Sequence, residues 1–259
     1  MDTKEHIIDV LINLWDPIGF MILSLTYLPG TIFALLTSFN LGALRSFDRV
    51  KDAWFARFWA VAGPAARETA IQNAEPMIKA ARGVVLDIGP GGGDWIHIFD
   101  KSRVTKIYGV EPNRDHYDAL RRKIKDAGLA DIYEIAECGV EGLTKWGIED
   151  ESVDSVITIQ CLCSVGEPEK MIKDLYRKLK VGGIWVLYEH VVTKQGGWVA
   201  MYQSCVNILW PHFLGGCEIT RDTEKSLREV GKWSKIDLKQ PAEEPSYKIL
   251  PHVMGVLEK

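Results

Sequence analysis

Two carboxylates and a glycine-rich loop form the pattern with the clearest chemical meaning in this sequence of 259 residues. Asp87 precedes a loop with glycine at every second position, Gly89, Gly91 and Gly93, and Glu111 follows 24 positions after Asp87. Glycines allow a backbone to come close to a ligand. A carboxylate can accept hydrogen bonds from both hydroxyls of a ribose. The pattern therefore predicts a site for a ligand that contains a nucleoside.

The same loop does not match two common types of phosphate-binding site. A dinucleotide fingerprint requires glycine five positions after Gly89, where this sequence has Asp94, so a pyrophosphate would meet a carboxylate. A phosphate-binding loop ends in Gly-Lys followed by Ser or Thr, and the loop here has no such ending. The remaining common ligand is S-adenosylmethionine, whose amino-acid moiety has no phosphate to neutralise.

Strand-like and helix-like segments alternate on both sides of this loop. Strands are predicted at residues 84–88, 107–110, 132–136, 153–161, 184–189, 234–238 and 252–257. Helical segments separate the first five, which indicates parallel strands, and a short loop joins the last two, which can pair antiparallel. We expect an α/β fold with a Rossmann-like, mostly parallel seven-stranded sheet, helices on both faces, a C-terminal antiparallel hairpin and extra N-terminal apolar helices. Ligands of such sheets bind at the carboxyl ends of the strands.

The N-terminal region differs in composition, because residues 17–44 contain no charged side chain. Pro29 and Gly30 predict a break into apolar helices at residues 18–28 and 31–44, each shorter than the ~20 residues of a spanning helix. The residues before this stretch are acidic, which does not fit a signal peptide. The basic residues that follow it suit the cytoplasmic face of a membrane. The stretch either contacts a membrane surface or covers the protein's own substrate pocket as a lid.

An amphipathic helix is predicted next and ends at Gly63-Pro64. Its apolar face recurs at spacings of three or four and consists of Phe47, Val50, Trp54, Phe58 and Val61. Such a face more often packs on a core than lines a pocket for an apolar substrate.

Charge and cysteine content exclude several classes of function. With 31 basic and 35 acidic side chains, the net charge of −4 provides no positive field for nucleic acid. The five cysteines match neither a disulfide framework nor a zinc-ligand spacing, which indicates a reducing compartment and predicts no metal; they are Cys138, Cys161, Cys163, Cys205 and Cys217.

Residues 84–93, 108–113 and 179–183 resemble, in this order, motifs of the class I S-adenosylmethionine-dependent methyltransferases, and the resemblance covers roughly residues 82–259. It implies S-adenosylmethionine as cofactor. It also implies a set of cofactor-binding residues: Asp87, Gly89, Pro90 and Gly91 at the methionine portion, Glu111, Pro112 and Asn113 at the ribose, Cys138, Gly139 and Val140 at the adenine, and Gln160 and Cys161 beside the sulfonium. Related enzymes often carry an acidic residue where Gly139 aligns, so only backbone contacts remain there.

Four further runs, residues 161–165, 189–191, 215–221 and 251–255, are similar to the membrane-associated thiol S-methyltransferases. That branch also carries an apolar N-terminal segment. The resemblance implies methyl transfer from S-adenosylmethionine and leaves the acceptor open. We expect a small hydrophobic acceptor that reacts through a thiol sulfur or a hydroxyl oxygen, and a cytoplasmic enzyme with or without contact to the cytoplasmic face of an intracellular membrane. We expect a helical extension at residues 1–62 and a methyltransferase domain at residues 63–259.

Methyl transfer from a sulfonium depends on alignment more than on acid or base catalysis. His190 follows the fifth strand where the acceptor would lie and is the candidate base, although a histidine bonded in a turn fits equally well. Glu189 is the candidate to orient His190 or the acceptor, or else a solvated strand end. An apolar segment between the fifth strand and the last helix indicates a hydrophobic acceptor; it contains Trp198, Met201, Tyr202, Ile208 and Trp210.

Two other functions are compatible with the same residues. A catalyst of the cyclase type would use the bound sulfonium as a fixed charge without transferring the methyl group. A membrane-tethered binding protein would carry a degenerate site, which the intact loop from Asp87 to Gly93 argues against.

Overall fold

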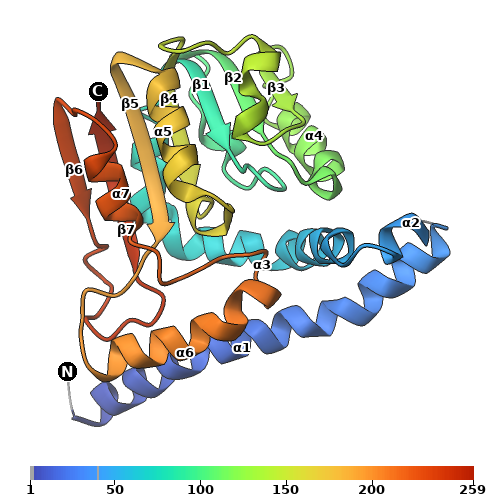
Figure 1. The fold of residues 1–259 in the computed structure, drawn as a ribbon, viewed down its shortest axis with the longest axis vertical. Coiled ribbons are helices and arrows are strands. Elements are labelled where there is room, and N and C mark those ends of the chain that lie inside the picture. Colours follow the sequence, from blue (N-terminus) through green and yellow to red (C-terminus); the bar gives the residue numbers. More distant parts are fainter. Residues whose placement is uncertain (1–2, 40) are drawn as a thin grey trace.

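A seven-stranded sheet with the order β3-β2-β1-β4-β5-β7-β6 forms the centre of the structure (Figure 1). The computed structural model describes residues 3–39 and 41–259. The strands are β1 (Gly83–Ile88), β2 (Val104–Val110), β3 (Tyr133–Ala136), β4 (Val153–Ile159), β5 (Leu179–His190), β6 (Lys235–Lys239) and β7 (His252–Glu258). The first five pair in parallel, whereas β7 is antiparallel to both β5 and β6. The predicted mostly parallel sheet with a C-terminal hairpin is confirmed.

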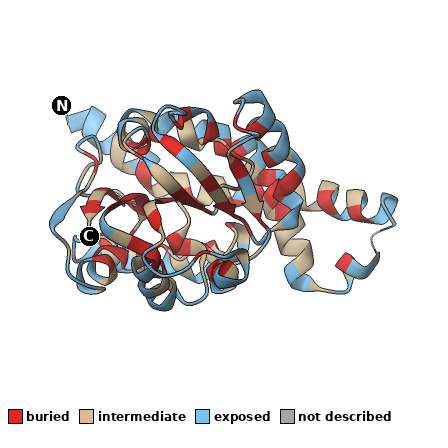
Figure 2. Cartoon of the chain, turned by 90° about the horizontal axis from the view of Figure 1, so that it is seen from above, coloured by how far each residue is buried: buried red, intermediate tan, exposed pale blue. Residues whose placement is uncertain are grey.

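Both faces of the sheet are covered, because successive side chains of a strand point to opposite sides. Leu86 and Trp185 belong to a core covered by α5 (Pro168–Lys178), α7 (Thr223–Glu229) and the 3-10 helix η3 (Val140–Trp146). Val85 and Val186 belong to the opposite core, which receives the end of α3 (Phe47–Ile78), α4 (Tyr117–Asp126) and the 3-10 helix η1 (Ile96–Ile98). Buried residues concentrate on the sheet and on the inward sides of these helices (Figure 2).

The first helix, α1 (Thr3–Thr37), is continuous over 35 residues and contains both Pro17 and Pro29. The predicted break at Pro29 and Gly30 is therefore wrong, and only the short α2 (Leu41–Leu44) is separate. Proline removes one hydrogen bond from a helix interior. Packing of α1 against α3 and α6 (Trp198–Phe213) along its length offsets that loss.

The second long helix, α3, also continues past its predicted end at Gly63-Pro64 and reaches Ile78. Its second half is held by burial against the sheet, where Ala74 and Ile78 are fully buried. The predicted apolar face is only partly a core face: Trp54 and Phe58 are buried, whereas Phe47 and Val61 are exposed. The predicted division between residues 62 and 63 falls inside this helix.

A helical layer made of α1, α6 and the first half of α3 lies at the end of the sheet toward which the parallel strands point (Figure 1). Three side-chain hydrogen bonds of 2.7 Å join its helices: Ser24 donates to the carbonyl of Phe213, Trp54 to that of Ser24, and Tyr202 to that of Leu14. The carboxyl ends of the strands, where ligands of such sheets bind, therefore face this helical layer.

Candidate functional site

The glycine loop after β1 lies against the end of β4. Gly89 has a φ of +64°, and a Cβ atom there would stand 2.6 Å from Sγ of Cys161. Glycine is therefore required at position 89 both by the backbone angle and by the close approach of Cys161. The structure thus brings together two of the predicted cofactor-binding segments.

Glu111, at the end of β2, is buried, with 5% of its surface exposed. Its Oε2 accepts the backbone N–H of Gly91 at 2.9 Å, and its Oε1 accepts that of Asn113 at 2.8 Å. Burial raises the pKa of this carboxyl to about 7. Each oxygen of a carboxylate has two lone pairs, so each can accept one further hydrogen bond. That capacity fits the two hydroxyls of a ribose.

Asp87 is buried at the end of β1, and desolvation raises its pKa to about 6. Its Oδ2 accepts the hydroxyl of Tyr133 at 2.8 Å, which leaves Oδ1 for a donor such as the ammonium of an amino acid. Tyr133 reaches Asp87 across Gly109, where any Cβ would collide with the tyrosine ring. Tyr133 is not recognisable as part of the site from the sequence, because no local pattern connects it with Asp87.

The predicted adenine segment follows β3. Cys138 donates its N–H to the carbonyl of Ala136 at 2.8 Å, and Val140 begins η3. The carboxylate of Glu141 lies so close to Gly139 that a Cβ there would overlap it. An acidic side chain is therefore present beside position 139. It belongs to Glu141, two positions after the place where related enzymes often carry one, and the expectation of backbone contacts alone did not include it.

Gln160 lies between β4 and the 3-10 helix η4 (Leu162–Ser164) and has a φ of +53°. A non-glycine residue in this region is uncommon and, where the surroundings hold it, often marks a functional site. The N–H of Gln160 donates to the carbonyl of Tyr188 on β5 at 2.7 Å. This turn directs the chain from Gln160 into Cys161 beside the glycine loop.

The two predicted catalytic residues, Glu189 and His190, are successive residues of β5 and so point to opposite sides of the strand. Glu189 is fully buried, which excludes a solvated strand end, and its carboxylate accepts the N–H groups of Cys161 at 3.0 Å and Leu162 at 3.0 Å. Burial raises its pKa to about 7. This geometry favours a role for Glu189 in positioning η4 over the predicted role in catalysis.

Helix α3 and the turn before α4 form a second wall of the site. A Cβ on Gly91 would lie 3.8 Å from the ring of Trp59 and 3.9 Å from that of His116. Phe55 stacks on Trp59 with 5.5 Å between ring centroids. Burial lowers the pKa of His116 to about 4, so the imidazole is neutral. The apolar pattern of α3 does not identify Phe55 and Trp59, which lie beside its predicted apolar face and not on it.

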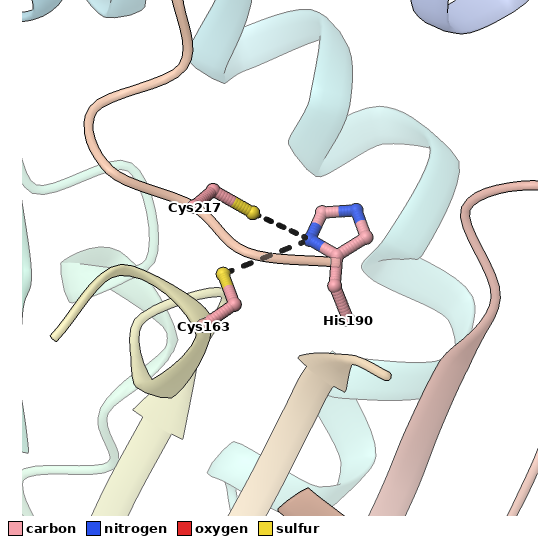
Figure 3. A group of neighbouring side chains, drawn as sticks. All are labelled: Cys163, His190 and Cys217. Atoms are coloured by element: carbon pink, nitrogen blue, oxygen red, sulfur yellow. Dashed lines mark hydrogen bonds between the residues drawn. The ribbon is translucent and has the colours of Figure 1, made fainter. Parts of the chain in front are cut away.

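His190 forms a cluster with two cysteines from other segments (Figure 3). Its Nδ1 lies 4.0 Å from Sγ of Cys163 in η4 and 3.9 Å from Sγ of Cys217 in the loop after α6. Both cysteines are buried in an apolar core that also contains Phe58 and Trp210. The expectation that the cysteines match no metal-ligand pattern rested on sequence spacing, which does not reveal this cluster.

The residues at these strand ends fit S-adenosylmethionine. Two buried carboxylates retain acceptor capacity, and the loop between them has no side chain at Gly89 to block the approach of a ligand. A pocket against the loop is lined by Asp87, Ile88, Gly89, Pro90, Gly93, Trp95, Ile96 and Ile159. Among these described lining residues none is Lys or Arg, as expected for a ligand without phosphate.

Comparisons with known proteins show which family the chain belongs to. Residues 86–187 match the methyltransferase domain family. Thiol S-methyltransferase TMT1A from Homo sapiens is 31% identical over 176 residues, which cover 68% of this chain and 70% of that protein. Thiol S-methyltransferase TMT1B from Rattus norvegicus is 29% identical over 175 residues, covering 66% of this chain and 68% of the relative.

Solved structures share the fold at low sequence identity. An O-methyltransferase family protein from Burkholderia thailandensis aligns with a TM-score of 0.59 and 14% identity over 90% of this chain and 71% of its own. The [4+2]-cyclase SpnF aligns with a TM-score of 0.57 and 16% identity over 75% of this chain and 81% of its own. The sequence relatives decide the family: the chain belongs to the class I S-adenosylmethionine-dependent methyltransferases, close to the thiol S-methyltransferase branch, and acts on a small molecule.

Proposed function

We propose that this enzyme methylates the sulfur of a small hydrophobic thiol. The observation that carries the proposal is the composition of the region between η4, the end of β5 and the helical layer. Its polar groups include the imidazole of His190 and two thiols, which lie among apolar and aromatic side chains. Such surroundings suit an apolar acceptor with a soft nucleophile, and two relatives of this chain are named for thiol S-methylation.

The proposed cofactor-binding residues are those of the predicted set. S-adenosylmethionine supplies, when bound, a methyl group on a sulfonium that leaves without protonation. In the proposed arrangement Asp87 holds the ammonium group, Glu111 holds the ribose hydroxyls, and Gln160 and Cys161 line the side toward the acceptor. We add Glu141 to the set, because its carboxylate beside Gly139 is suited to accept from an adenine amino group.

The acceptor must lose its proton during the reaction. A thiol has a pKa of about 8.5, so a small fraction is already thiolate at neutral pH. His190 is the proposed residue that assists this loss, since it is the titratable side chain that faces both thiols of the cluster. Glu189 acts at a distance by holding the N–H groups of Cys161 and Leu162, and so fixes the segment that carries Cys163.

A matched pair of acceptors tests the proposed function. The enzyme is incubated with methyl-labelled S-adenosylmethionine and either thiophenol or phenol, which share one carbon skeleton. We expect label in the thioether product at a rate at least about tenfold above that of the ether, because the thiol ionises far more readily at neutral pH. Label in the phenol ether with none in the thioether would contradict a sulfur acceptor.

We also propose that residues 1–62 cover the active site with one face of α1 and contact a membrane surface with the other. Within the described residues, α1 is the one helix that is long and apolar enough to cross a membrane. However, Met21 and Leu35 are buried against the domain, and α1 packs on α3 and α6. A helix held in this way along the domain suits a position in the plane of the interface better than a spanning one.

The outward face of the helical layer is apolar over much of its length. Its exposed large side chains on α1 and α6 include Ile8, Leu11, Trp15, Ile22, Phe33, Trp198, Met201, Ile208 and Leu209. Two aspartates of α1 bind side chains of the C-terminal part of the chain. Asp9 accepts the hydroxyl of Tyr247 at 2.5 Å, and Asp16 pairs with Lys248 at 3.5 Å. Many exposed apolar side chains on neighbouring helices are typical of a membrane or protein contact.

The double variant Leu11→Glu/Phe33→Glu tests the membrane proposal. Both side chains are exposed, 58% and 68%, so we expect thermal stability to change little. Binding to phosphatidylcholine vesicles in a sedimentation assay should fall by about tenfold or more, because two apolar side chains no longer leave water. Val181→Glu is the matched control, since Val181 is 77% exposed on β5 outside the helical layer. Equal vesicle binding by all three proteins would refute the proposal.

A further inference from the structure

The cluster of Cys163, His190 and Cys217 has the composition and the spacing of a metal site. Sγ of Cys163, Nδ1 of His190 and Sγ of Cys217 lie within 4.8 Å of one another (Figure 3). The two sulfur-to-nitrogen distances are 4.0 and 3.9 Å. With Zn–S bonds of about 2.3 Å and a Zn–N bond of about 2.0 Å, tetrahedral coordination places sulfur and nitrogen ligands about 3.6 Å apart. Both sulfur-to-nitrogen distances are therefore within a few tenths of an ångström of the tetrahedral value.

The backbone around both cysteines is fixed by hydrogen bonds. Glu218 donates its N–H to the carbonyl of Cys163 at 2.8 Å, which joins the loop of Cys217 to η4. Arg221 donates to the carbonyls of Leu162 at 2.9 Å and Val165 at 2.6 Å. Both ends of η4 are therefore held before any metal binds, as a selective metal site requires.

The imidazole of His190 is also held in place. Its ring stacks on His252 with 4.3 Å between centroids and an interplanar angle of 35°. His252 in turn has its Nδ1 2.5 Å from a carboxylate oxygen of Glu244. This ring contact helps to hold the imidazole in the orientation in which Nδ1 faces the two sulfurs.

The number and type of ligands indicate which ions the site would bind and whether its role would be structural or catalytic. Two thiolates and a neutral imidazole form a soft donor set that selects zinc-like cations and carries a charge equal and opposite to that of a divalent cation. Cys163 and Cys217 are 1% and 6% exposed, so the resulting neutral site suits its apolar surroundings. Structural zinc sites have four protein ligands, whereas catalytic ones have three and leave a position for water or substrate.

We propose that Cys163, His190 and Cys217 bind a thiophilic divalent cation of the zinc type, whose fourth position takes the acceptor sulfur as a thiolate. Each cysteine thiol, and then the acceptor thiol, releases its proton to water as its sulfur binds the cation. The second half of this proposal rests on the proposed thiol acceptor. With a cation bound, His190 is a ligand through Nδ1 and no longer the group that assists loss of the acceptor proton. The cation then stabilises the acceptor thiolate.

The location of the cluster suits that role. Cys163 follows two positions after Cys161, whose Sγ lies against the glycine loop at Gly89. A thiolate held at the cation would therefore lie on the acceptor side of the cofactor-binding strand ends. A soft cation prefers sulfur to hydroxyl oxygen, so the site would also select thiols among apolar acceptors.

Cobalt titration of the metal-free, full-length protein tests the metal site without any activity measurement. We expect one equivalent of Co²⁺ to produce the absorption of tetrahedral cobalt with sulfur-to-metal charge transfer. Cys163→Ser and Cys217→Ser should each weaken Co²⁺ binding by at least about tenfold and reduce the charge-transfer absorption. Cys205→Ser is the matched control, because Cys205 is exposed on α6 away from the cluster, and its titration should match that of the wild type.

Two further measurements test the acceptor position. Thiophenol added to the cobalt-loaded protein should change the charge-transfer band, and Zn²⁺ added to chelator-treated protein should restore lost thiol methylation. The proposal is overturned if no cysteine-dependent cobalt absorption forms, if mass spectrometry finds a Cys163–Cys217 disulfide in place of a metal, or if metal-free protein methylates thiols at the full rate. A cobalt band that responds to thiol in an enzyme that methylates no thiol would instead reject the proposed function and leave the metal site standing.

Discussion

Gly89→Ala is expected to weaken cofactor binding by at least about tenfold and to lower the free energy of unfolding by about 1–2 kcal/mol. The backbone at Gly89 has a φ of +64°, which costs an alanine free energy that glycine does not pay. The added Cβ would also stand 2.6 Å from Sγ of Cys161, so the glycine loop or the end of β4 must move. Calorimetric titration with S-adenosylhomocysteine and chemical denaturation measure the two effects.

Gly92→Ala is the matched control in the same loop. Its Cβ would meet only the Cβ of Ala119 at 3.8 Å, an ordinary contact, so affinity and stability should stay near those of the wild type. The double variant Gly89→Ala/Cys161→Ala separates the two causes: removal of the sulfur should restore part of the stability and leave the backbone cost. If Gly89→Ala binds the cofactor product as well as Gly92→Ala does, the ligand does not lie against this loop.

Glu111→Gln is expected to weaken cofactor binding by about 10- to 100-fold at pH 8, because an amide provides one acceptor oxygen where the carboxylate provides two. The two oxygens of Glu111 already accept the N–H groups of Gly91 and Asn113, so the amide nitrogen would also face one of these donors. Calorimetric titration gives the affinity, and thermal unfolding shows whether the variant is folded. Glu134→Gln, an exposed residue of β3 that pairs with Lys106, is the matched control.

The same variant should lose a dependence on pH that the wild type has. Burial raises the pKa of Glu111 to about 7, so the carboxyl of the cofactor-free protein is protonated below that pH and ionised above it. The ionised form accepts both ribose hydroxyls, so the affinity should rise by about tenfold between pH 6 and pH 8. Titration of the ligand itself affects both proteins alike, which makes the difference between their profiles the measurement. Parallel profiles would show that Glu111 does not hold the ribose.

The succession of strands along the chain and the position of the glycine loop were predictable because their signals are local. A β-branched run that ends at Asp87 and the loop of Gly89 can be recognised within ten residues, and Glu111 is placed by the end of the next strand. Parallel strands bring their carboxyl ends to one edge of the sheet. Each of these steps needs only short-range pattern and the general geometry of α/β folds.

The helix boundaries near prolines were not predictable in the same way. Pro29 and Pro64 are both inside helices, although each removes a helical hydrogen bond. Contacts between α1, α3 and α6, and the burial of Ala74 and Ile78 on the sheet, decide that these helices continue. Such contacts join residues far apart in the chain, so a local rule about proline does not include them.

The sequence by itself determined the fold class, the glycine loop and the position of Glu111 at a strand end, because these depend on periodicity and on residues close together in the chain. Only the tertiary structure decided which distant side chains meet. Tyr133 reaches Asp87 from another strand, and Cys163, His190 and Cys217 come together from a turn, a strand end and a loop. The physical reason is that such contacts depend on how whole helices and strands pack together. The spacing of cysteines and histidines along the chain does not specify that packing.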